Sequence, residues 1–220
     1  RLARLDRKVQ TVKRRNLRSR RIGEADIMEA DGTLHGIRQW PRLGRVLDLP
    51  VHFEPVTDNV YLEDFYKDMK TWGFHSQLYF LTHKFKLHMA LNTRATTVVQ
   101  DRTIYEDAEI FATNLYKGRY IKKRDYETYM ELYETMKGAL QPPDLMIYLR
   151  CSVGAIRKRI KQRGRKSEQD IPTSYLRRLN GLYEEWIERY SQSPVLVWDS
   201  ERMDYLTDIV DRIEFKRQID

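Results

Sequence analysis

The stretch VVQDRTIYED, residues 98–107, changes abruptly from an apolar run to a cluster of charge. Val98 and Val99 are β-branched, which favours a strand, and the run ends on an acid beside a base, Asp101-Arg102. Open α/β sheets bind ligands in the crevice outside the carboxyl ends of their strands. The pair therefore indicates either a binding site or a solvated strand terminus, and the rest of the chain has to distinguish the two.

Three more runs in the chain have the same apolar density. Besides TTVVQD (96–101), which contains the first run, these are VHFEPV (51–56), LMIYLR (145–150) and PVLVWD (194–199). Runs this rich in apolar residues are typical of parallel strands covered on both faces. Because helical patterns separate them, the sequence predicts an α/β fold with a doubly wound parallel sheet flanked by helices.

The segments between these runs carry apolar residues at helical spacing. The first extends over residues 62–85 and is interrupted near Gly73; the others cover 126–140, 153–160 and 179–187. Their aromatic residues are interpreted as core, since a stripe at this spacing is what a helix buries against a sheet.

Basic residues are concentrated at the start of the chain. Residues 1–50 hold 13 Lys/Arg and 6 Asp/Glu, whereas the whole chain of 220 residues has a net charge of +8. The first fifty residues contain no Tyr or Phe. We expect residues 1–50 to be an atypical basic segment, with a poorly packed helix or arm over 1–22, and residues 51–220 to form the folded domain. A nucleic-acid interface on the basic arm is a weaker hypothesis.

Cys151 is the single cysteine of the chain, which excludes an internal disulfide and is typical of a reducing compartment. No apolar run approaches the roughly 18 residues that span a bilayer, and no signal-peptide pattern is seen. We therefore expect a cytoplasmic protein without a membrane partner.

Charged residues at two predicted strand ends suggest acid–base chemistry. Glu54 follows the first run, where Pro55 ends the ladder, and Asp101-Arg102 follows the second. A carboxylate and a guanidinium facing one crevice can deprotonate a hydroxyl and hold the resulting anion. Further along, the segment 156–172 carries three arginines suited to phosphate oxygens, with Gly164 as a hinge: Arg159, Arg163 and Arg165.

Residues 51–216 resemble the deoxyribonucleoside kinase family, close to its bacterial purine-preferring members. The matching motifs are FEPVTDNVYLEDFYKDMKTWGFHSQLYFL, QDRTIYEDAEIFATNLY, PDLMIYLR, RIKQRGRKSEQ and YLRRLNGLYEEW. The resemblance implies a P-loop NTPase fold of the adenylate-kinase type and transfer of the ATP γ-phosphate to the 5′-hydroxyl of a deoxyribonucleoside, purine preferred. It also implies ATP and Mg²⁺ as cofactors, a homodimer and a role in nucleotide salvage.

The resemblance assigns a role to each matching residue. Glu54 corresponds to the general base for the 5′-hydroxyl, Arg102 to the group that holds the 5′-oxygen, and Asp101 to the acidic residue near Mg²⁺. Gln77 corresponds to the amide that pairs with the base edge, and an amide can give two hydrogen bonds to an adenine-like edge. The other matches are the sugar-binding residues, the pair that sets base preference and the lid arginines: Tyr66 and Glu184; Lys84 and Asp107; Arg159, Arg163 and Arg165.

One family motif has no counterpart in the sequence. None of the ten glycines is followed by Lys, so the pattern G-x-x-x-x-G-K-[ST] is missing, and the family spacing places Gly36 where its Lys belongs. That loop cradles the β- and γ-phosphates and its Ser/Thr holds the metal. Three explanations remain open: an error of reading frame or assembly in residues 1–50, a degenerate kinase retained as a non-catalytic binding or structural subunit, or another loop with the same task.

Overall fold

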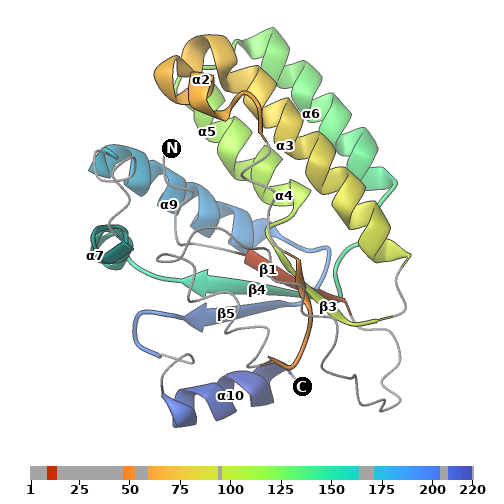
Figure 1. The fold of residues 1–220 in the computed structure, drawn as a ribbon, viewed down its shortest axis with the longest axis vertical. Helices are drawn as coiled ribbons and strands as arrows, with labels where there is room; N and C mark the ends of the chain where they lie inside the picture. Colours follow the sequence, from red (N-terminus) through yellow and green to blue (C-terminus); the bar gives the residue numbers. More distant parts are fainter. Residues whose placement is uncertain are drawn as a thin grey trace.

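The structure is a computed structural model that describes residues 9–13, 47–52, 59–93, 96–163, 171–203 and 208–219, with the backbone alone at 9–13 and 163. Strands and helices alternate along most of the chain (Figure 1). The elements are β1 (Val9–Lys13), β2 (Val51–His52), α2 (Leu62–Lys67), α3 (Met69–Asn92), β3 (Val98–Asp101), α4 (Ile104–Glu106), the π-helix η1 (Asp107–Ala112), α5 (Thr113–Lys117), α6 (Lys123–Gly138), β4 (Leu145–Arg150), α7 (Val153–Arg163), α9 (Thr173–Arg189), β5 (Val195–Asp199) and α10 (Ile209–Ile219).

The five strands form one sheet in the order β2-β3-β1-β4-β5. β2 pairs parallel with β3, and β4 pairs parallel with β5. β1 lies between the two pairs and runs antiparallel to both of its neighbours. The four strands expected from their apolar runs therefore all point in the same direction, which confirms the predicted α/β class.

The central strand β1 was not predicted. Residues 1–22 were expected to be an arm or a poorly packed helix, but Val9–Lys13 occupies the middle of the sheet, so that expectation is wrong for these five residues. Its register places Gln10 opposite Asp101 and Lys13 opposite Val98. Because β1 is antiparallel, its last residue, Lys13, lies at the amino end of β3, away from Asp101.

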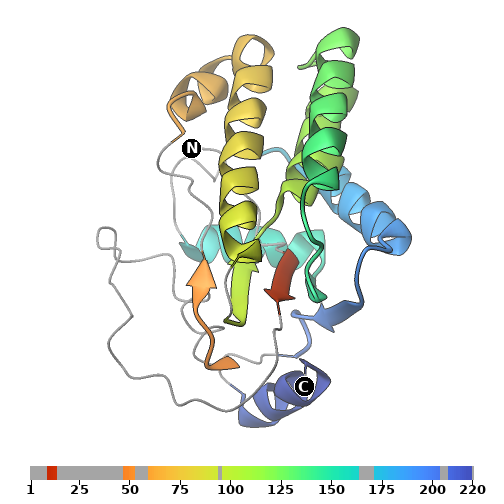
Figure 2. The same cartoon turned by 90° about the vertical axis from the view of Figure 1, so that its right-hand side faces the viewer.

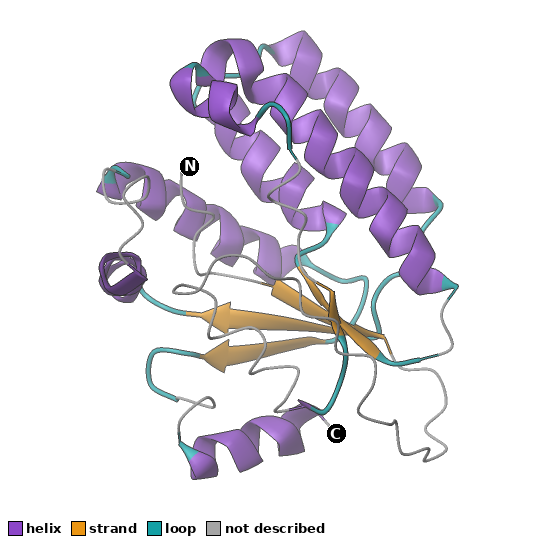
Figure 3. Cartoon of the chain, viewed as in Figure 1, coloured by secondary structure: helices purple, strands orange, loops and turns teal. Residues whose placement is uncertain are grey.

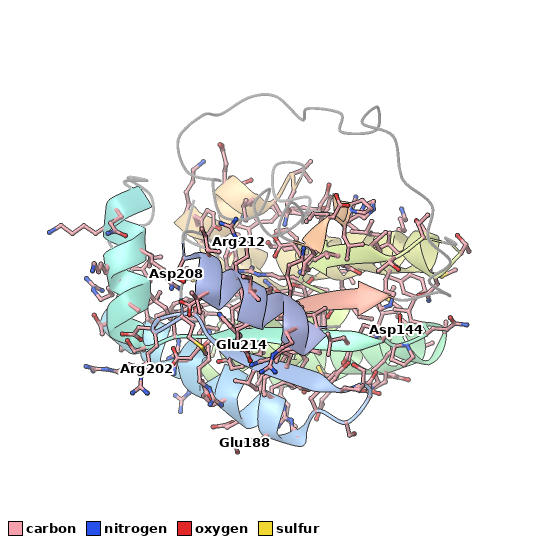
Figure 4. All side chains as sticks on the ribbon, turned by 90° about the horizontal axis from the view of Figure 1, so that it is seen from below. Asp144, Glu188, Arg202, Asp208, Arg212 and Glu214 are labelled. Atoms are coloured by element: carbon pink, nitrogen blue, oxygen red, sulfur yellow. The ribbon has the colours of Figure 1, made fainter. Side chains whose placement is uncertain are left out.

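Apolar side chains cover both faces of the sheet, as a doubly wound fold requires. On one face, Trp198 of β5 packs edge-on against Phe215 of α10, with the ring centres 4.9 Å apart. Seen from below, α10 lies across this face and carries Arg212 and Glu214, with Asp208 just before its first residue (Figure 4). On the other face, the larger core joins the sheet to η1, α6 and α9, so the strands form the middle layer (Figure 3).

The helical interruption expected near Gly73 lies five residues earlier. Asp68 separates α2 from α3, and its side chain accepts hydrogen bonds from the backbone N–H groups of Lys70 and Thr71. This N-cap starts a new helix that continues through Gly73 to Asn92. α3 stands beside α6 above the sheet (Figure 2). Among the described residues, none of the helices has the length and hydropathy needed to cross a membrane.

Candidate active site

The carboxyl end of β3 carries a buried pair of opposite charges. Asp101 is 3% exposed and Arg102 is fully buried. Arg102 has a φ of 62°, in the left-handed region that residues with a Cβ seldom adopt. Its guanidinium lies over the Phe111 ring, 5.1 Å from the ring centre. Asp101-Arg102 is therefore not a solvated strand terminus, because both side chains are buried.

A second buried ion pair lies next to this turn. Lys84 on α3 and Asp107 at the start of η1 are 2.8 Å apart and only 1% and 0% exposed. The Lys84 ammonium also donates to the backbone carbonyl of Thr103 at 3.5 Å. Lys84 and Asp107 are 23 positions apart in sequence. The fold thus brings together, from two helices, the pair that the resemblance identified. Buried ion pairs contribute little net stability but impose a defined geometry on their surroundings.

Gln77 lies two helical turns before Lys84 on the same face of α3. It is 5% exposed, and its Oε1 is buried with no hydrogen-bond partner among the residues that the structure describes. A buried amide oxygen left unpaired costs roughly 1–3 kcal/mol, so such atoms need an explanation. A ligand that donates a hydrogen bond to this oxygen would remove the cost.

Glu184 on α9 faces the end of β4. Its carboxylate accepts a hydrogen bond from the Tyr148 hydroxyl at 2.9 Å and pairs with Arg150 at 2.8 Å. Arg150 is the last residue of β4, so it occupies the position in its strand that Asp101 occupies in β3. Sequence reasoning missed Arg150, although a charge at the end of the run LMIYLR is the same signal that identified Asp101-Arg102.

Tyr183 connects the two strand ends through aromatic contacts. Its ring lies parallel to that of Tyr148, at 6.0 Å, and edge-on to Phe111, at 6.5 Å. Phe111 in turn lies under Arg102. The Tyr183 hydroxyl is buried without a partner among the described residues. Burial raises the pKa of this hydroxyl well above its ordinary value, so it remains protonated.

The remaining candidate residues are placed less fully. Tyr66 on α2 packs against the cluster of Phe65, Leu115 and Ile121. Arg159 on α7 donates to the carbonyl and the hydroxyl of Ser200, which links α7 to the turn after β5. Glu54, Arg165 and the side chain of Arg163 lie outside the described residues.

The turn after β5 also holds the start of α7. The Glu201 carboxylate accepts a hydrogen bond from the backbone N–H of Ser152 at 2.8 Å, and this bond lowers the pKa of Glu201. The arrowheads of β4 and β5 point toward α7 (Figure 1). The carboxyl ends of β3, β4 and β5 lie at one edge of the sheet, and the charged groups named above gather there. In the part of the chain that the structure describes, no group of three His, Cys, Asp or Glu side chains could hold a metal ion.

The sheet, its flanking helices and the polar groups at the carboxyl ends of its parallel strands make this an α/β protein, and its likeness to solved deoxyadenosine kinases gives the P-loop NTPase fold. The match to the deoxynucleoside kinase family model covers residues 40–220, and the chain belongs to that family of ATP-dependent phosphotransferases.

Named relatives support the same conclusion. The chain is 42% identical to a deoxyadenosine kinase of Dictyostelium discoideum over 68% of this chain and 61% of that protein. It is 39% identical to a deoxyadenosine/deoxycytidine kinase of Bacillus subtilis over 78% of this chain and 82% of that protein. Among solved structures, deoxyadenosine kinase from M. mycoides with bound dATP superposes with a TM-score of 0.69 at 31% identity, covering 81% of this chain and 90% of that one.

Proposed function

We propose that this protein phosphorylates a purine deoxyribonucleoside at its 5′-hydroxyl, with ATP as phosphate donor. The observation that carries this proposal is the buried Oε1 of Gln77, which has no hydrogen-bond partner among the described residues and lies on the face of α3 that also presents Lys84. An amide with one open acceptor and one donor group matches the edge of a purine base. The ion pair between Lys84 and Asp107 holds the helices that carry the neighbouring side chains in a fixed position.

The groups at the strand ends supply the chemistry in this proposal. Glu54 removes the proton from the 5′-hydroxyl, and Arg102 holds the oxygen as negative charge develops. Tyr66 and Glu184 bind the sugar 3′-hydroxyl. The phosphates are bound by the lid arginines Arg159, Arg163 and Arg165.

Mg²⁺ fits this site through Asp101. Mg²⁺ commonly takes one or two carboxylates and completes its shell with phosphate oxygens and water. A single carboxylate at the end of β3 meets that requirement without a larger metal cluster. When bound, the ion would neutralise charge on the β- and γ-phosphates.

The donor side of the site is incomplete in the printed sequence. The motif G-x-x-x-x-G-K-[ST] is missing, and Lys13, the last residue of β1, lies opposite Val98, at the end of β3 away from Arg102. We therefore propose that residues 1–50 do not supply the phosphate cradle of the family. We keep the proposed kinase-like domain over 51–220, with the qualification that β1 of the first fifty residues pairs within its sheet and the family match covers residues 40–220.

We further propose that the protein is a cytoplasmic homodimer. Half-buried and exposed rings follow one face of α3, where Trp72 lies 5.5 Å from the exposed His75 and Tyr79 stacks on His83 at 3.8 Å. A face of this kind is suited to association with a second copy. Sedimentation analysis would measure the mass of the particle directly.

Calorimetry tests the nucleoside site in the chain as printed. Deoxyadenosine or deoxyguanosine should bind more tightly than thymidine, and Gln77→Ala should weaken purine binding by roughly 1–3 kcal/mol because the base edge loses its partner. Gln218→Ala is the matched control, since Gln218 is exposed on α10 and its side-chain amide donates to Glu214 at 2.7 Å. Absence of nucleoside binding, or an equal loss for every base in Gln77→Ala, would refute the proposal.

A further inference from the structure

Glu106 is a buried carboxyl group that the proposed reaction does not use. It is fully buried at the end of α4. One oxygen, Oε2, accepts from the backbone N–H of Thr103 at 2.7 Å and from its hydroxyl at 2.5 Å. The other oxygen, Oε1, is buried and has no hydrogen-bond partner among the described residues.

These bonds act on the peptide group that joins Arg102 to Thr103. Its N–H is the Thr103 group that donates to Glu106. Its carbonyl oxygen belongs to Arg102 and accepts a hydrogen bond from the Gln100 side-chain amide at 2.9 Å. Both ends of one peptide plane are therefore held by side chains, which fixes ψ of Arg102 and φ of Thr103.

The peptide needs such restraint because Arg102 is left-handed. A residue with a Cβ in this region is strained by about 1–2 kcal/mol, and such strain persists only where the surroundings impose it. The same turn sets the guanidinium over Phe111, in the π-helix that begins directly after Glu106. A relaxed turn would therefore move the guanidinium away from this ring.

We propose that Glu106 is a positioning residue that fixes the Arg102–Thr103 peptide and thereby aims the Arg102 guanidinium at the 5′-oxygen of the substrate. This inference rests on the proposed function of Arg102. The competing explanation is an ordinary capping box that stabilises α4 and nothing else. The two explanations differ in whether loss of Glu106 acts selectively on ligands that carry a 5′-phosphate.

Calorimetry with deoxyadenosine and its 5′-monophosphate separates the two explanations without requiring catalysis. In Glu106→Ala, affinity for the monophosphate should fall about tenfold or more, the size of one charge-assisted hydrogen bond, while affinity for deoxyadenosine changes less than about twofold. Glu106→Gln keeps an acceptor oxygen for Thr103 and should restore most of the loss. Glu109→Ala is the matched control, because Glu109 lies three residues after Glu106, on η1, and pairs with Arg189.

Equal losses for both ligands, or a lowered melting temperature with unchanged affinities, would overturn the positioning role. If the wild-type chain binds neither ligand, the proposed function fails, and a ligand-independent measurement still decides the role of Glu106.

Arg102→Gly and Arg102→Ala both lack the guanidinium, but only the second retains left-handed strain. We expect Arg102→Gly to have the higher melting temperature, and this gap to shrink by about half or more when Glu106→Ala relaxes the turn. A gap unaffected by Glu106→Ala would overturn the inference.

Discussion

Arg102 concentrates three unusual properties in one residue: a left-handed backbone, a fully buried guanidinium and a place at the end of a central strand. The left-handed backbone and the buried charge each lower the free energy of unfolding. The side chains of Gln100, Glu106 and Phe111 hold this conformation in place. Strained residues with buried charge are typical of functional sites, where the geometry serves the ligand rather than stability.

Glu106 should give the protein a measurable pH dependence. Burial raises its pKa from 4.5 to about 7, against the opposing effects of Lys84, the Thr103 hydrogen bonds and Arg102. The folded protein then holds a proton that the unfolded chain releases. This contribution to the free energy of unfolding is fully present below pH 4.5 and is lost as the pH rises through about 7. Tyr105 and Tyr183 do not titrate in this range, because burial raises the pKa of both.

Urea unfolding of the wild type and of Glu106→Gln from pH 4.5 to pH 8 would isolate this effect. The wild type should lose stability relative to the variant up to about pH 7 and run parallel to it above. Glu109→Gln should keep the wild-type slope. Parallel curves for wild type and Glu106→Gln across the whole range would contradict the assignment.

Among the elements, α3 and η1 carry residues of the proposed nucleoside site, and the ion pair between Lys84 and Asp107 joins the two helices. Lys84→Met should destabilise the protein by about 3–5 kcal/mol, because Asp107 then keeps a buried charge without this partner. The double variant Lys84→Met/Asp107→Leu should recover much of that loss. Lys67→Met is the control, since Lys67 pairs with Asp64 at 3.6 Å in solvent and should change stability by less than about 1 kcal/mol. A double variant less stable than the single one would show that the two residues do not act as a pair.

The elements also show which features could be predicted from sequence. β3 and β4 were predicted because uninterrupted β-branched and apolar residues identify buried strands. α6 and α9 were predicted from their apolar stripes. β1 was missed because VQTVK lies among arginines and lysines, and only its two partner strands make it a strand. The start of α3 was misplaced because Gly73 was taken as a breaker, whereas the cap at Asp68 decides where the helix begins.

The site was predictable to a similar degree. Asp101 and Arg102 could be recognised at a strand end, and the resemblance paired Lys84 with Asp107. The capping box of Thr103 and Glu106 has a sequence signature that was missed, whereas the left-handed turn at Arg102 could not be predicted, because no Gly marks it.

At the scale of the whole molecule, we propose that the sheet carries a nucleoside site that is retained and a phosphate-donor site that is altered. Asp101, Arg102, Arg150 and Glu184 lie where β3 and β4 end. The antiparallel β1 instead ends with Lys13 opposite Val98, at the amino end of β3. The printed chain should therefore bind deoxynucleoside but phosphorylate it weakly, since losing the phosphate cradle costs on the order of 10³-fold in rate.

The central claim is that this sheet edge holds the working nucleoside half of a deoxynucleoside kinase. A coupled kinase assay with deoxyadenosine, ATP and Mg²⁺ tests it most directly, on the printed chain and on a chain whose residues 1–50 are replaced by a family-type strand and G-x-x-x-x-G-K-[ST] loop. We predict little activity in the first, Mg²⁺-dependent activity in the second, and a loss of about 10²–10⁴-fold when Glu54→Gln removes the base from the second. A replaced chain that folds and binds deoxyadenosine but transfers no phosphate would contradict the claim.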